Sequence, residues 1–141
     1  MLTIGAVVLT INAGFNLLLA TAILVGVICL GKNPPILCVA LGQTEVARLE
    51  DKIIAMVKSL ATYFNAAVVS FCLISILVIW AGLSHGEKWA FWALFASMGI
   101  NQILGFVADS FIGNKTLAVN IVLTAIYSLG IAFSWYGLRM N

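Results

Sequence analysis

Three polar residues stand close together in the apolar stretch NQILGFVADSF: Asn101, Gln102 and Asp109. A carboxylate in such a setting can take up a proton or bind a cation or a basic ligand, and amides can hold the polar end of a ligand. With similar residues elsewhere in the chain they predict one ligand-binding polar cluster: Asn16, Tyr63, Asn65, Asn101, Gln102, Asp109 and Asn120. A second interpretation is that the same side chains hold helices together.

Asp109 has two interpretations of its own. A carboxylate at the centre of a membrane helix costs about 2.5–3.5 kcal/mol, and less near the interface. Asp109 either caps the turn that follows it, by pairing with Lys115 or accepting a hydrogen bond from Thr116, or serves as a protonatable site that binds a cation or a basic ligand.

Other chemistry finds little support. His85 is the only histidine, and Cys29, Cys38 and Cys72 form no C-x-x-C pair. Neither a metal site nor a thiol redox motif is therefore predicted. The sequence GKNPP lacks the spacing of a phosphate-binding loop. We predict no catalytic residue, metal or cofactor, and whether the chain is an enzyme stays open.

The composition points to a membrane as the solvent. Hydrophobic residues make up 63% of the 141 residues and charged residues 9%, with a mean hydropathy of +1.15. Soluble domains carry about 25% charged residues and cannot bury so much apolar surface at this size. The net charge of +2 is too small and too scattered for a nucleic-acid-binding surface.

Four apolar windows are long enough to cross a bilayer as helices: residues 3–30, 59–83, 88–110 and 116–138. The predicted fold is an all-α integral membrane four-helix bundle, a single transmembrane domain over residues 1–141. The first window is expected to be a mature span, because it is longer than a signal peptide and no basic segment precedes it.

The sequences SHGEK and DSFIGNKT form short connections between spans two and three and between spans three and four, whereas the connection over residues 31–58 is long. Gly31, Pro34 and Pro35 are expected to end the first helix. An amphipathic helix is predicted from residue 44 to 58, and it either rests on the membrane surface or forms the leading end of the second span. Ser84 and Glu87 predict a capping box before the third span.

Basic residues predict the orientation. Five of them fall on one side (Lys32, Arg48, Lys52, Lys58 and Lys115) and two on the other (Lys88 and Arg139). The positive-inside rule then places residues 31–58 in the cytoplasm and both termini outside. Trp80, Trp89, Trp92 and Trp135 all fall near the predicted outer interface, as an aromatic belt would.

Spans three and four each carry a stripe of small or polar residues in steps of four. The stripes are Ala93, Ser97, Asn101, Gly105 and Asp109, and Thr116, Asn120, Thr124, Ser128 and Ala132. If the helices fold back about the turn, with Thr116 as a cap, Asp109 lies level with Thr116, Gly105 with Asn120, and Asn101 with Thr124. Such seams allow close approach and hydrogen bonding between helices in lipid.

The segments NPP, GLSHGEKWAFWAL and GFVADSFIGNKTLAVNIV make the chain resemble uncharacterised small four-span bacterial integral membrane proteins over about two-thirds of its length. The resemblance implies a bacterial cell membrane and no activity. Small multidrug exporters differ, since they depend on a glutamate in the first span that this chain lacks.

The leading functional hypothesis is a non-enzymatic accessory or scaffolding protein, or a bundle that binds a lipophilic ligand. The alternatives are a small oligomeric transporter that uses Asp109 and an enzyme acting on a membrane-soluble substrate. The expected partners are the lipid bilayer and either further copies of the chain or another membrane protein.

Overall fold

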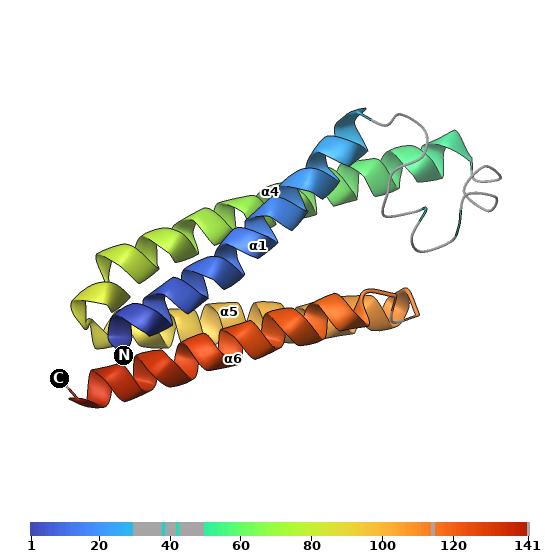
Figure 1. Cartoon of the computed structure of the whole chain (residues 1–141). Coiled ribbons are helices and arrows are strands. Elements are labelled where there is room, and N and C mark those ends of the chain that lie inside the picture. Colours follow the sequence, from blue (N-terminus) through green and yellow to red (C-terminus); the bar gives the residue numbers. More distant parts are fainter. Residues whose placement is uncertain (30–37, 39–41, 43–49, 114, 141) are drawn as a thin grey trace. The chain divides into compact units, whose positions relative to one another are not determined.

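Long helices account for most of the structure. The computed structural model describes residues 1–29, 38, 42, 50–113 and 115–140 (Figure 1). In these ranges the chain forms α1 (Leu2–Cys29), α4 (Asp51–Ala81), the short 3-10 helix η1 (Leu83–His85), α5 (Lys88–Phe111) and α6 (Leu117–Met140). The four α-helices are each long and apolar enough to cross a membrane. The predicted all-α fold with four spans is thereby confirmed.

The chain divides into two compact units. The first unit comprises Met1–Phe15 and Cys72–Asn141, and the second comprises Asn16–Phe71. The first unit therefore holds the beginning of α1, the end of α4, and all of α5 and α6. The second unit holds the rest of α1 and α4.

Glycines on α6 let α1 approach closely in the first unit. A Cβ atom added at Gly130 would lie 2.7 Å from the side chain of Leu9, and one added at Gly137 would lie 2.5 Å from the backbone nitrogen of Leu2. Gly130 and Gly137 are seven residues apart, so they share one face of α6. Lipid provides no hydrophobic drive for helix association, and the close packing that small residues permit takes its place.

The turn between α4 and α5 is built differently from the predicted capping box. The Ser84 hydroxyl donates to the carbonyl of Trp80 at 2.6 Å, and Glu87, the N-cap residue of α5, makes no side-chain capping bond. Residues Leu83–His85 form η1 after α4 has ended at Ala81, so Ser84 belongs to that turn and not to α5. Gly86 then reverses the chain with a φ of +82°. The capping-box prediction is wrong.

In the second unit, α4 begins well before the predicted second span. The helix runs unbroken from Asp51 through residue 58 into the apolar stretch. Its 31 residues span about 46 Å, which exceeds the roughly 30 Å of hydrocarbon in a bilayer. Within residues 51–58 the amphipathic segment is thus the leading end of span two. Residues 43–49 and the predicted helix end at Gly31, Pro34 and Pro35 lie outside the described residues.

Candidate functional site

The turn between α5 and α6 is closed by Asp109. Its Oδ1 atom accepts hydrogen bonds from the backbone N–H of Thr116 at 2.7 Å and from the Thr116 hydroxyl at 2.6 Å. The side chain is only 2% exposed, and the second carboxylate oxygen, Oδ2, has no hydrogen-bond partner among the residues described. The bonds to Thr116 are those expected of the capping interpretation.

One level further from the turn, α5 and α6 meet as predicted. The Asn120 amide donates to the carbonyl of Gly105 at 3.3 Å, and a Cβ atom at Gly105 would lie 3.4 Å from Asn120 Oδ1. The distance shows that the backbone of α5 at Gly105 lies close to the side chain of Asn120. Asn120 therefore acts as an inter-helix contact in the first unit.

The third predicted level is shifted by one residue. Thr124 donates to Oε1 of Gln102 at 3.4 Å, and the Gln102 amide reaches Oδ1 of Asn12 on α1 at 3.5 Å. Gln102 is buried, whereas Asn101 is partly exposed. A four-residue step overshoots a helical turn by about 40°, so a row in steps of four winds off the seam with distance from the turn. The predicted pairing of Asn101 with Thr124 is wrong.

Asn12 extends this contact to a third helix. Its side-chain amide donates to the carbonyl of Leu123 at 2.7 Å, and the residue is fully buried. The path Thr124, Gln102, Asn12 and Leu123 thus ties α5, α6 and the beginning of α1 together. The spacing of Asn12 and Asn16 on one face of α1 was the only sequence signal for this contact.

The predicted cluster members of the second unit are placed separately. Asn65 is buried and donates to the carbonyl of Ala61 one turn earlier at 2.8 Å. Tyr63 is 80% exposed, and Asn16 is partly exposed. These three residues belong to the second unit, whereas Asn101, Gln102, Asp109 and Asn120 belong to the first. The combined seven-residue cluster therefore stays a prediction.

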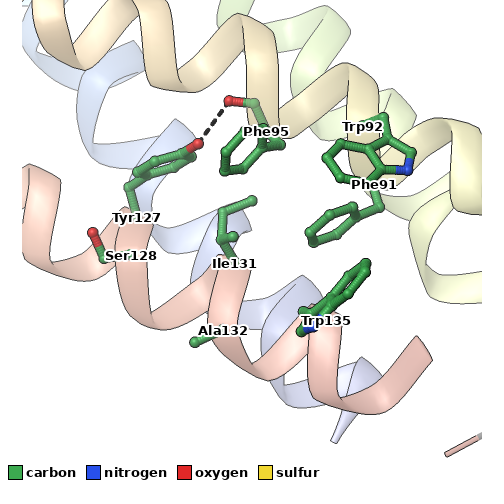
Figure 2. Close-up of a pocket in the computed structure, with 8 residues that line it drawn as sticks. All are labelled: Phe91, Trp92, Phe95, Tyr127, Ser128, Ile131, Ala132 and Trp135. Atoms are coloured by element: carbon green, nitrogen blue, oxygen red, sulfur yellow. Dashed lines mark hydrogen bonds between the residues drawn. The ribbon is translucent and has the colours of Figure 1, made fainter. Parts of the chain in front are cut away.

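The hydrogen bonds of Thr116, Asn120 and Thr124 on α6 to Asp109, Gly105 and Gln102 on α5 form a polar seam between the two helices. Beyond this polar seam, α5 and α6 frame an aromatic groove that the sequence analysis did not predict. The groove has a volume of about 390 Å³ and is lined by eight residues: Phe91, Trp92, Phe95, Tyr127, Ser128, Ile131, Ala132 and Trp135 (Figure 2). Trp92, Phe95 and Trp135 are 55%, 46% and 39% exposed, so the groove is open along its length. Ser128 and Ala132, predicted to lie in the seam, face this groove instead.

Tyr127 closes the groove on the side of the polar seam. Figure 2 shows its hydroxyl donating to the carbonyl of Phe95, at 2.7 Å. Gly99 makes room for the hydroxyl, because a Cβ atom there would lie 2.9 Å from it. The apolar groove is thereby separated from the hydrogen bonds around Gln102.

The other end of the groove is a cluster of aromatic rings and a cation. The ring of Trp135 lies 5.4 Å from Phe91 and 6.0 Å from Trp92, measured between centroids. The guanidinium carbon of Arg139 lies 4.8 Å from the Trp135 ring centroid, within the range of a cation–π interaction. The aromatic belt predicted the tryptophans as interface anchors, but it gave no sign that they enclose a groove.

Two arrangements in the described residues bear on metal binding and on nucleophile activation. Across the described ranges no three His, Cys, Asp or Glu residues are grouped to hold a metal ion. Ser84 Oγ lies 3.2 Å from Nδ1 of His85, yet the hydroxyl already bonds to the Trp80 carbonyl in an exposed turn. This pair therefore lacks the arrangement of an activated nucleophile.

These features define a small all-α membrane protein with a polar seam and an aromatic groove on one helical hairpin. Searches of protein-family models, curated proteins and solved structures found no match to the chain.

Proposed function

We propose that the protein is a non-enzymatic membrane protein whose α5–α6 groove binds the apolar chain of a lipophilic ligand. The groove volume of about 390 Å³ falls within the roughly 300–1,000 Å³ of small-molecule sites, and its lining is mainly aromatic and aliphatic. The single observation that carries the proposal is this open aromatic groove. The protein would act as an accessory or receptor unit within the membrane.

The polar seam supports the assignment of ligand binding to the groove. Thr116, Asn120 and Thr124 each direct a side-chain hydrogen bond to α5. Side chains engaged in this way hold the hairpin together and are not available to a ligand without breaking those bonds. The seam is the scaffold in this proposal, and the groove is the binding surface.

The sequence suggests where the groove lies. The distribution of Lys and Arg favours both termini outside and residues 31–58 in the cytoplasm of a bacterial cell. The groove would then lie in the outer half of the cell membrane. There its tryptophans are at the depth that these side chains favour.

A second candidate function, a small oligomeric transporter, draws on one observation. Oδ2 of Asp109 is buried and without a hydrogen-bond partner in the described part of the chain, and carboxylates inside membrane spans mark substrate or ion pathways in transporters. A transporter should lose substrate flux with Asp109→Asn while remaining folded. Unchanged flux in that variant would remove this candidate.

Fluorescence quenching tests the groove directly. The protein, reconstituted in phosphatidylcholine vesicles, is titrated with a neutral monoacylglycerol that carries bromine atoms in its chain. Bromine quenches tryptophan on contact, so binding beside Trp92 and Trp135 should give a saturable loss of fluorescence. Ala132→Phe, which fills the groove, should weaken the saturable part at least several-fold, whereas Ala118→Phe on the same helix should not.

The result that contradicts the proposal is equally definite. Quenching that rises linearly with probe, without saturation, and to the same extent in all three proteins would show that the groove meets only bulk lipid.

A further inference from the structure

Two basic residues lie at the end of the aromatic groove that is formed by Phe91 and Trp135, opposite Tyr127. The contact between Phe91 and Trp135 brings the start of α5 level with the end of α6. Lys88 lies one turn before Trp92 on α5, and Arg139 lies one turn after Trp135 on α6. Both side chains are exposed. Each wall of the groove therefore ends in a cation.

Arg139 is held over the lining of the groove. Its guanidinium carbon lies 4.8 Å from the centroid of the Trp135 ring, which is itself part of the groove wall. A guanidinium offers five N–H donors in a planar fork that suits phosphate oxygens. A molecule with an apolar chain in the groove would thus present its polar end to a phosphate-binding group.

The first turn of α5 adds to the positive potential. The first N–H groups of a helix have no partners within it and carry the positive end of the helix dipole. Glu87 is the N-cap residue but makes no side-chain capping bond. Of these three charged residues, Glu87 is acidic and Lys88 and Arg139 are basic.

We infer that the groove holds one acyl chain of an anionic phospholipid, with the lipid phosphate bound by Arg139 and Lys88. This inference rests on the proposed function, since it requires that the groove accept an apolar chain. It adds a headgroup preference, because an apolar groove alone does not distinguish lipids of different charge. A basic residue near an anionic membrane surface contributes about 1 kcal/mol.

The test compares two headgroups with the same chains. The full-length protein is placed in phosphatidylcholine vesicles containing increasing fractions of either brominated phosphatidylglycerol or brominated phosphatidylcholine, and tryptophan quenching is measured. We expect phosphatidylglycerol to be preferred by about fivefold or more. Arg139→Gln and Lys88→Gln should each bring the preference toward one. Lys52→Gln, which removes an exposed charge from the first turn of α4, should leave it unchanged.

The outcomes separate this inference from the proposed function. Saturable quenching by the neutral probe, combined with equal quenching by the two phospholipids, would overturn the anionic preference and leave the groove function intact. A preference that Lys52→Gln reduces as much as Arg139→Gln does would also overturn it, because the effect would then reflect net charge. An absence of saturable quenching, with a dimer that Ala132→Phe dissociates, would assign the groove to a second copy of the chain and overturn both proposals.

Discussion

The Asp109 carboxylate and Thr116 are joined twice through one oxygen. Oδ1 of Asp109 accepts the backbone N–H of Thr116 at 2.7 Å and its hydroxyl at 2.6 Å. Thr116 directly precedes α6, and its N–H would otherwise be unpaired next to an apolar segment. The buried carboxylate in the last turn of α5 thus pairs with the residue that precedes α6 and fixes the turn between the two helices.

This relationship predicts unequal effects of two substitutions at Asp109. Asp109→Ala removes the acceptor of both bonds, and hydrogen bonds to a charged group contribute about 1.5–3 kcal/mol each, so we expect a loss of about 3 kcal/mol in the free energy of unfolding. Asp109→Asn keeps an oxygen acceptor at the same place and should lose about 1 kcal/mol or less. Reversible unfolding in mixed detergent micelles, followed by circular dichroism, measures both. Equal losses would contradict the capping role.

The glycines of α6 predict a second pair of outcomes. In Gly137→Ala the new methyl group would meet backbone atoms of Leu2, which cannot rotate away, so α1 and α6 must separate. We expect a destabilisation of about 1–3 kcal/mol in the same unfolding assay. Gly14→Ala on α1 is the matched control, because a Cβ atom there meets no described atom within 4 Å. It should be neutral or slightly stabilising, and a loss equal to that of Gly137→Ala would contradict the account.

The one-residue shift in the seam gives a third prediction. Gln102→Leu removes the acceptor of Thr124 and the donor to Asn12. Unfolding should therefore become easier by about 0.6–1.7 kcal/mol, which runs from the average to the largest contribution of such bonds in membranes. Asn101→Leu, the adjacent amide, should cost less because the side chain is partly exposed. If Asn101→Leu proved the more damaging of the two, the register described for the seam would be incorrect.

Much of the fold could be predicted because membrane spans have a strong signal. Each window needs only length and a low density of charge, and the helices lie within a few residues of the predicted windows except at the start of α4. The levels nearest the α5–α6 turn were also predictable. A short turn fixes the register there, which is why Asp109 meets Thr116 and Gly105 meets Asn120.

Predictions were wrong or missing where the outcome depended on rotation along the helix or on packing between helices. The rows in steps of four drift around the helix, so the expected partner of Thr124 was displaced from Asn101 to Gln102. Aromatic residues near an interface have anchoring as a sufficient explanation, and their arrangement into a groove requires the packing of Phe91 against Trp135. The Ser84–Glu87 pattern failed because a local motif does not reveal that a separate 3-10 helix, η1, takes up Ser84 before α5 begins.

The central claim is that an apolar chain occupies the groove between α5 and α6, and photolabelling tests it most directly. A phospholipid with a photoreactive group in its acyl chain is cross-linked to the reconstituted protein, and the modified residues are mapped by mass spectrometry. We predict labelling concentrated on groove residues such as Phe95 and Ile131, reduced by excess unlabelled lipid and by Ala132→Phe. Labels spread evenly over the exposed faces of all four helices, and unaffected by that substitution, would contradict the claim.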